Sequence, residues 1–272
     1  MRKFVVALAI ISLSASLSAQ TDNDRNRNVV VAALSVTSDS RISSSNLEDI
    51  RAQIQNQRYS EDALSEIGAS VRYALQTRGY FKSRVGEPEV KVLERSALGS
   101  TIAVTLPIDQ GEQYRLREIS FSNNKVFSSA QLRSHFDIGA GDIFNTKKIR
   151  LGLEELRKLY GSDGYINFTP VPNTQTDEAA RLVSLNVDVD EGAQFRFGPL
   201  ELAGEEPRPG VGQKLVVAWQ PYVGKVCDPT LAESFWKEHL IPFLPSGSHV
   251  QDVVEQSVHP QEHIVAYKVT FP

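Results

Sequence analysis

Cysteine is nearly absent from this sequence, and so are long apolar segments and an excess of positive charge. The single Cys227 cannot form an intramolecular disulfide, so hydrophobic burial alone must hold the fold. We expect an inert, half-buried thiol there, with an intermolecular bridge or a redox role as the alternative. The formal net charge of −4 argues against a nucleic-acid partner, which requires clustered lysine and arginine. With 41% hydrophobic and 23% charged residues, the composition is that of an ordinary globular protein.

The one long apolar run lies at the N-terminus. Basic residues at positions 2 and 3 precede the apolar stretch Phe4–Leu17, and Ser18-Ala19-Gln20 follows it. This order predicts a secretory signal peptide over residues 1–19, cleaved near Ala19. The alternative is a retained anchor, but a membrane span needs about 20 apolar residues and serines interrupt this run. We therefore expect an exported protein with no transmembrane segment after cleavage.

Motifs of catalysis are also missing. The sequence has no Gly-x-Ser-x-Gly nucleophile motif and no glycine-rich phosphate loop followed by lysine. A metal site is the open alternative, because His259 and His263 have the spacing of two ligands on one helix, with His249, Glu255 and Glu262 nearby. Pro260 lies between them and favours a turn instead. The sequence therefore predicts no enzyme and no catalytic, cofactor-binding or metal-binding residues, with a metal-binding or hydrolytic protein as the least favoured reading.

A pattern of about eighty residues occurs twice along the chain. Arg78-Gly79-Tyr80-Phe81 and Asp163-Gly164-Tyr165-Ile166 each close a helical stretch. Two segments with the pattern of extended strands follow each of these motifs. The first copy then reads Gln110-Gly111-Glu112-Gln113-Tyr114, and the second reads Glu191-Gly192-Ala193-Gln194-Phe195. The same order at similar spacing indicates tandem modules.

The second copy shows the order of elements most clearly. After an opening strand, Ser128 predicts the capping box of a short helix, and Asn145 or Thr146 caps a second helix. An extended stretch after Gly164, a turn around Asn173 and the alternating strand 182–189 complete the copy. The predicted order is β-α-α-β-β.

The first copy repeats this order. Ser45 predicts the start of its first helix and Ser60 the start of its second, while residues 90–93 and 102–108 supply the hairpin. The third copy is divergent and lacks the Gly-Tyr pair. Its clearest signal is Asp228-Pro229, which starts a helix before a hairpin of residues 249–258 and 263–271.

The sequence therefore predicts an α+β fold of three tandem β-α-α-β-β modules, each a three-stranded sheet covered by two helices. A linker over residues 20–28 follows the signal peptide. The predicted modules cover residues 29–111, 112–192 and 193–272.

This module resembles the POTRA (polypeptide-transport-associated) domain. The resemblance is carried by Leu156-Arg157-Lys158-Leu159-Tyr160, by the following Gly164-Tyr165, and by Val189-Asp190-Glu191-Gly192. Gly79, Tyr80 and Gly111 hold the matching places in the first copy, so these glycines and tyrosines are expected to define the modules. The resemblance is to the periplasmic part of BamA/TamA-type outer-membrane assembly factors. Those proteins usually continue into a β-barrel, which we do not expect here because only Pro272 follows Phe271.

The resemblance implies protein–protein recognition in the periplasm, in outer-membrane protein assembly or polypeptide secretion. A sheet edge could bind an extended segment by β-augmentation. The candidate edge follows the second Gly-Tyr pair and comprises Asn167, Phe168, Thr169 and Val171. Expected partners are envelope proteins, either an outer-membrane barrel protein or unfolded clients. Pro170 and Pro172 leave open a protected edge, and a structural spacer is the alternative function.

Overall fold

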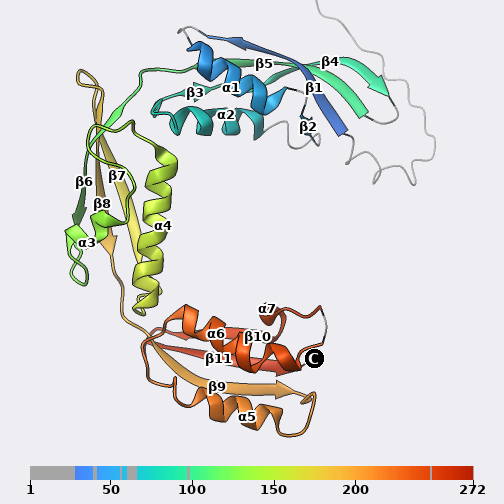
Figure 1. The fold of residues 1–272 in the computed structure, drawn as a ribbon, viewed down its shortest axis with the longest axis vertical. Helices are drawn as coiled ribbons and strands as arrows, with labels where there is room; N and C mark the ends of the chain where they lie inside the picture. The colour runs from blue at the N-terminus through green and yellow to red at the C-terminus, as the bar shows by residue number, and fades with distance from the viewer. Residues whose placement is uncertain are drawn as a thin grey trace, which may run out of the picture. The chain divides into compact units, whose positions relative to one another are not determined.

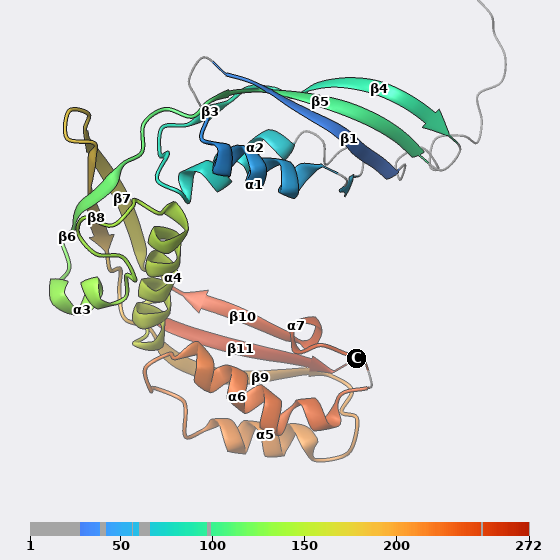
Figure 2. The ribbon, with the colours of Figure 1, turned by 45° about the horizontal axis from the view of Figure 1, so that its top comes forward.

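The computed structural model describes residues 28–38, 42–55, 57–59, 66–96, 99–245 and 247–271. The chain forms two compact units. One comprises Met1–Leu75 and Ser83–Gly111, and the other comprises Gln76–Lys82 and Glu112–Pro272. Three separate sheets follow one another along the chain, each with helices on one face (Figures 1 and 2). The predicted α+β fold of three modules is confirmed, while the predicted signal peptide lies outside the described residues.

The first module is built around a central strand with buried residues at every second position. That strand, β5 (Gly99–Asp109), is parallel to β1 (Asn28–Thr37) and antiparallel to β4 (Glu89–Ser96). Two short strands extend the predicted three: β2 (Arg58–Tyr59) pairs with β1, and β3 (Arg84–Val85) pairs with β5. One face is covered by α1 (Ser44–Ile54) and α2 (Ile67–Gln76) (Figure 2).

The second module has the same plan. Its strands are β6 (Arg115–Ser122), β7 (Thr169–Asp177) and β8 (Leu182–Asp190), in the order β6-β8-β7. The central β8 is parallel to β6 and antiparallel to β7. Its odd-numbered residues Val183, Leu185, Val187 and Val189 are buried. They join a core with side chains of α3 (Ser129–Ser134) and α4 (Thr146–Ser162).

The third module is a sheet in the order β10-β11-β9 with an aromatic core around Trp219 and Trp236. Its strands are β9 (Arg196–Gly204), β10 (Val254–His259) and β11 (Ile264–Phe271). Its helices are α5 (Val211–Trp219), α6 (Pro229–His239), the short η2 (Ile241–Phe243) and α7 (Val250–Val253). The predicted hairpin starts late, because residues 250–253 form α7 rather than strand.

Three predicted helix starts are confirmed. Ser128 closes a capping box with Gln131, and Asn145 and Asp228 cap α4 and α6 by accepting backbone N–H groups. The start at Ser45 is wrong, because Ser43 accepts the N–H of Asn46 instead. The predicted start at Ser60 lies outside the described residues.

The predicted turn around Asn173 is also wrong. β7 runs through that residue to Asp177, and Asn173 pairs with Asn186 of β8. The turn lies further on and ends at Arg181, which has a φ of 54°. Asparagine is frequent in turns, but pairing along the full length of β8 outweighs this local preference.

A glycine fixes how closely α4 approaches the rest of its module. A Cβ atom added to Gly152 would lie 2.3 Å from Cδ1 of Phe136, a buried ring of the same core. Gly161, on the same helix, would place its Cβ in open space. Alanine at Gly152 therefore tests both packing and helix propensity, whereas alanine at Gly161 tests helix propensity alone.

We predict opposite effects for alanine at these two positions. Gly152→Ala lowers the free energy of unfolding by about 1–3 kcal/mol, because the ring of Phe136 must move. Gly161→Ala raises it by up to about 1 kcal/mol, since alanine restricts the unfolded chain and favours helix. Denaturant unfolding followed by circular dichroism measures both. Equal effects of the two substitutions would contradict the packing argument.

Candidate functional site

The first Gly-Tyr loop packs against the second module. The loop Gln76–Lys82 belongs to the same compact unit as that module. The N–H of Tyr114 donates to the carbonyl of Gly79 at 2.8 Å, and Nε2 of Gln113 donates to the carbonyl of Arg78 at 2.8 Å. The ring of Phe81 meets that of Phe144 edge-on at 5.1 Å. The loop is thereby part of the packing of the second module.

The second Gly-Tyr loop makes the same contacts with the third module. The N–H of Phe195 donates to the carbonyl of Gly164 at 2.8 Å, and Nε2 of Gln194 donates to the carbonyl of Asp163 at 2.9 Å. Ile166 packs against the core of the third module, in the place that Phe81 holds in the first loop. Each copy of the Gly-Tyr motif therefore forms a loop that packs against the following module, and we call these two contacts the first and the second joint.

Glycine is required at both joints by conformation and by space. Gly79 has a φ of 88° and Gly164 a φ of 81°, in the left-handed region. A Cβ at Gly164 would lie 2.7 Å from the carbonyl oxygen of Phe195. Both tyrosines are half-buried, and Tyr165 lies edge-on to Tyr160, with 5.9 Å between the ring centroids.

We predict that Gly164→Ala lowers the free energy of unfolding of the third module. Gly224 is the matched control, because its φ is 80° and a Cβ there meets nothing within 4 Å. Gly224→Ala carries only the conformational cost of about 1–2 kcal/mol, and Gly164→Ala adds the clash with the Phe195 carbonyl. Both tryptophans lie in the third module, so tryptophan fluorescence during denaturant unfolding reports its stability. Equal losses in the two variants would contradict a tight joint.

The acidic residue before Gly192 anchors a loop of the second module. The carboxylate of Glu191 accepts the N–H groups of Lys125 and Val126 at 2.8 and 2.9 Å, and the hydroxyl of Tyr160 at 2.9 Å. Burial alone would raise the pKa of Glu191, but these hydrogen bonds outweigh it and lower the pKa below 4.5. Burial, followed by the bond to Glu191, raises the pKa of Tyr160 above its usual 10.

The first module has an amide in the equivalent place. Gln110 is buried and accepts a hydrogen bond from Nδ2 of Asn46 at 3.0 Å. Gly111 and Gly192 follow with φ values of 66° and 65°, so each strand ends in the same left-handed residue. In both modules the glycine of this motif follows the end of a strand, and the residue before it binds another element: Gln110 binds helix α1, and Glu191 binds the loop before α3.

We predict that Glu191 stabilises the second module in a pH-dependent way. Its lowered pKa means that the contribution is complete above pH 4.5 and is lost as the pH falls through the lowered value. Glu191→Ala, which leaves two N–H groups without their acceptor, costs about 1–3 kcal/mol at neutral pH. Glu191→Gln retains an acceptor and loses less. Melting curves across pH should show the advantage of wild type over Glu191→Gln shrinking in acid; a constant difference would exclude the carboxylate as its source.

A polar cluster closes the first joint on the side of the β7–β8 turn. Glu178 accepts hydrogen bonds from Lys82 and Tyr114. The bond to Glu178, then burial, raises the pKa of Tyr114 to about 12. The hydrogen bond from Lys82, then that from Tyr114, lowers the pKa of Glu178. Lys82 and Glu178 are largely exposed, so this ion pair contributes little to stability.

One edge strand of the second module is β7, which pairs only with β8 among the described strands; β6 lies at the other edge of this sheet. The N–H of Arg115 in β6 donates to the carbonyl of Arg181, so odd-numbered residues from 181 onward point their backbone groups toward β6. Even-numbered residues of β8 therefore face β7. By the register, odd-numbered residues of β7 face β8 and even-numbered residues face outward.

This alternation decides what the candidate residues do. Asn167 and Phe168 precede β7, and the buried ring of Phe168 stacks on Tyr160 at 3.9 Å. Thr169 and Val171 lie in β7, but their backbone groups face β8. Pro170 and Pro172 face outward without an N–H. The candidate edge at Asn167–Val171 stays a prediction, and the part of it that lies in β7, residues 169–171, offers an incoming strand no backbone N–H.

The edge strand β4 of the first module is different. β4 pairs only with β5 among the described strands, and it contains no proline. The N–H of Gly86 donates to the carbonyl of Pro107 at 2.9 Å, so odd-numbered residues of β5 face β4. Val90 and Val92 pair with the even-numbered Val104 and Ile102, and their own N–H and C=O groups therefore point outward.

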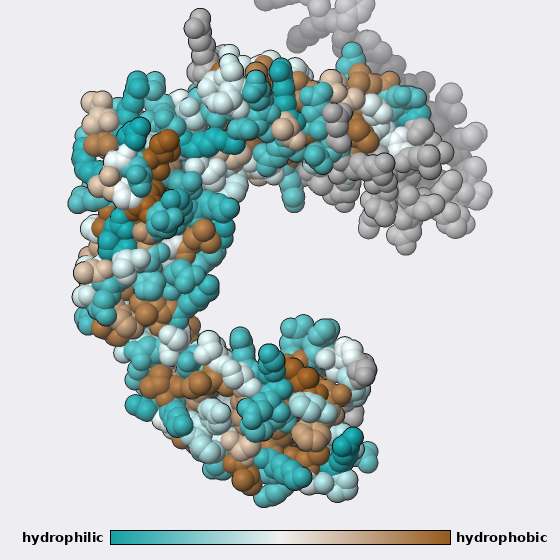
Figure 3. Space-filling model, viewed as in Figure 1, coloured by the Kyte–Doolittle hydropathy of each residue, from teal (hydrophilic) through white to brown (hydrophobic). Residues whose placement is uncertain are grey.

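The side chains of this edge are apolar and uncovered. Val90 and Val92 lie on the same face of the sheet as the fully buried Val104, yet they are 45% and 42% exposed. Leu93, at the bulge in β4, is 52% exposed. In the space-filling view most of the surface is hydrophilic, with apolar side chains scattered between (Figure 3). Outward donors and exposed valines thus coincide on β4.

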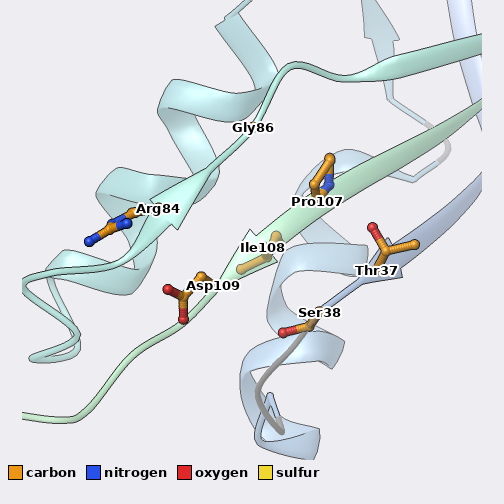
Figure 4. A pocket seen from close by; sticks show the side chains of 7 residues that line it. All are labelled: Thr37, Ser38, Arg84, Gly86, Pro107, Ile108 and Asp109. Carbon is orange, nitrogen blue, oxygen red and sulfur yellow. The ribbon is translucent and has the colours of Figure 1, made fainter.

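A shallow pocket lies beside the segment that joins β3 to β4. It has a cavity volume of about 250 Å³ and lies where the chain passes from β3 to β4 at Gly86, beside Pro107 of β5 and the end of β1 (Figure 4). A Cβ at Gly86 would lie 3.3 Å from the ring of Pro107. The pocket is the space beside a strand break and holds no cluster of reactive groups.

The third module also has an edge with outward donors. The N–H of Arg196 donates to the carbonyl of His263, which by the same argument turns even-numbered residues of β11 toward β10. Even-numbered residues of β10 then face outward, namely Val254, Gln256 and Val258. The turn between β10 and β11 includes Pro260, as the sequence predicted for the segment between His259 and His263. Among the described residues, no group of three His, Cys, Asp or Glu side chains is placed to hold a metal ion.

Cys227 lies inside the third core rather than half-buried. It is 2% exposed, and burial raises the pKa of its thiol to about 11. Such a thiol is protonated and unreactive at neutral pH.

No described helix is long and apolar enough to cross a membrane.

Comparison with known proteins gives the same family. Residues 114–192 match the model of the POTRA family, described as a surface antigen variable number repeat. The outer membrane protein assembly factor BamA of Neisseria meningitidis is 24% identical over 161 residues, which cover 56% of this chain and 20% of that protein. BamA of Buchnera aphidicola is 20% identical over 131 residues, covering 48% of this chain and 21% of that protein. The chain thus spans about a fifth of the length of these relatives.

A solved structure shares the fold across all three modules. The crystal structure of POTRA domains 3–5 of BamA from Haemophilus influenzae has a TM-score of 0.65 and 20% sequence identity, covering 92% of this chain and 100% of that one. The chain therefore has the fold of three tandem POTRA domains, and residues 114–192 match the family model itself. Its particular likeness is to the POTRA region of BamA.

Proposed function

We propose that this chain is a periplasmic recognition module in outer-membrane protein assembly. The support is the match of residues 114–192 to the POTRA family and the sequence similarity to two BamA proteins. The fold likeness to BamA POTRA domains 3–5 agrees with this. The proposed work is binding of other polypeptides, which requires exposed backbone and apolar groups rather than reactive side chains.

The observation that carries the proposal is the edge of β4. Its outward N–H and C=O groups, at Val90 and Val92, can continue the sheet onto an extended segment of another polypeptide. An added strand would place every second side chain beside these two exposed valines and would remove them from water. Backbone pairing tolerates many sequences, which suits a protein that receives different clients.

Partners on this account are envelope proteins in an extended conformation, including unfolded outer-membrane proteins. Exposed edge strands are usually protected by proline or covered. β4 contains no proline, although Pro88 stands directly before it. The row of outward groups therefore extends from Val90 through Val92 to Arg95 beyond the bulge.

A spacer is the second candidate function, and the repeated joint supports it. The second and third modules are tied by two hydrogen bonds at the Gly164 loop and by the packing of Ile166. A joint of this kind holds two modules at a fixed separation. Peptide binding distinguishes the two functions, because a spacer needs no open edge.

We predict that Val90→Pro weakens binding of a blocked synthetic peptide of alternating valine and threonine by about fivefold, the effect of one hydrogen bond. Proline there removes an outward donor and leaves the β4–β5 pairing intact. Val90→Thr is the matched control, because it keeps the N–H and the branched shape. Fluorescence anisotropy of the labelled peptide measures the affinity. Unchanged affinity in Val90→Pro, with the fold verified by circular dichroism, would move the binding site away from β4.

A further inference from the structure

The two longer helices of the third module have a small apolar pocket between them. α5 and α6 lie side by side, and the pocket is found where α5 begins and α6 ends (Figure 2). Its cavity volume is about 240 Å³, and its apolar lining consists of Val211, Leu215, Pro242 and Phe243. Val211 and Leu215 are buried and belong to the aromatic core, so the pocket is backed by the folded module.

This pocket is separate from the second joint. A Cβ atom at Gly164 of the joint would lie 2.8 Å from Val226, and α6 begins three residues later, at Pro229. A helix of 11 residues is about 16 Å long. The end of α6 that lines the pocket is therefore well removed from the contact with the second module.

The size and the walls of the pocket indicate what it can bind. Its 240 Å³ is less than the roughly 300–1,000 Å³ of a small-molecule site, and it suits one apolar side chain. The backbone groups of α5 and α6 are used within the helices, so an extended segment finds no strand to join here. Recognition at this place depends on side chains, as when a helix binds to a groove between helices.

Opposite charges flank the apolar lining. Lys214 of α5 and Glu238 of α6 both line the pocket and are exposed. Among the described residues Lys214 has no ion pair, and the carboxylate of Glu238 lies 3.9 Å from Nε2 of the adjacent His239. The pocket thus presents a positive charge on one helix, apolar groups between, and a negative charge on the other. Residues four apart on a partner's helix would supply the matching row.

We propose that this pocket receives one leucine of a partner's amphipathic helix, with an acidic residue of that helix beside Lys214 and a basic residue beside Glu238. The inference goes beyond the proposed function, because it concerns side-chain recognition by the helices of the third module. The proposed function uses backbone groups of β4 in the first module. The two sites can therefore be tested separately in one protein.

The probes are blocked, alanine-based helical peptides with three marked positions spaced four residues apart. One peptide carries Glu, Leu and Lys, and a second carries Lys, Leu and Lys. NMR titration of the whole chain measures both affinities. The wild type should bind the first peptide about threefold more tightly, the effect of one exposed ion pair, with shifts at the amides of Lys214, Leu215 and His239. Alanine in place of the peptide's leucine should weaken binding about tenfold.

Lys214→Glu should invert the preference, so that the peptide with two lysines binds more tightly. Lys147→Glu is the matched control, because Lys147 is exposed on α4 of the second module and its reversal changes the net charge equally. This control should keep the wild-type preference. Both substitutions are at exposed positions, and tryptophan fluorescence verifies the fold of the third module.

Three results would overturn the inference: no shift at the pocket amides, equal binding of the peptide without leucine, or a preference that Lys214→Glu leaves unchanged. Pocket shifts that follow protein concentration without peptide would identify a second copy as the occupant and also overturn it. Shifts at Val90 and Val92 alone would refute the pocket and leave the β4 site standing. Shifts at the pocket alone, with the inverted preference, would support the inference whatever the fate of the β4 site.

Discussion

The hydrogen bonds of a sheet alternate in direction along each strand, and this constraint governs every sheet edge described above. Each of the three sheets has a central strand, β5, β8 or β11, whose backbone groups are used on both sides. The strands β4, β7 and β10 use one side only. On their other side every second residue presents its N–H and C=O outward, so the residue at each such position decides whether the edge is open. Valine leaves β4 open, and proline closes part of β7.

Backbone hydrogen bonds also connect each Gly-Tyr loop to the following module. The carbonyl of the glycine accepts the N–H of the residue immediately before the next opening strand. A glutamine side chain donates to the carbonyl of the residue before that glycine. A large apolar residue two places after the glycine, Phe81 or Ile166, then packs with the following module. The joints differ in one respect, since Tyr114, Lys82 and Glu178 form a polar cluster at the first. In both cases the Gly-Tyr loop packs against the module that follows it.

The sequence predicted a large part of this fold. Short-range signals sufficed where the cause is local: Ser128, Asn145 and Asp228 cap helices through their own side chains, and the alternation of residues 182–189 marks a strand buried on one face. Asn173 misled because a local turn preference was outweighed by pairing with a strand later in the chain. Glu191 could be recognised as part of a motif, but its bonds to Lys125 and Val126 join residues more than sixty positions apart.

The candidate edge was the hardest part to predict, again for a physical reason. Which residues of a strand face outward depends on register and on bulges, such as those opposite β5 and β8. The sequence showed that Pro170 and Pro172 lack a backbone N–H, but it did not show that their nitrogen atoms point away from β8. The valines of β4 were recognised as strand residues, whereas their exposure follows from how far the helices cover the sheet.

Hydrogen exchange at the amides of Val90 and Val92, with and without the alternating valine–threonine peptide, tests the central claim most directly. The account predicts that these two amides, which point away from β5, exchange more slowly when the peptide binds, while the amide of Lys91, already paired with β5, changes little. Binding that slows amides elsewhere and leaves Val90 and Val92 unaffected would contradict recognition at the β4 edge.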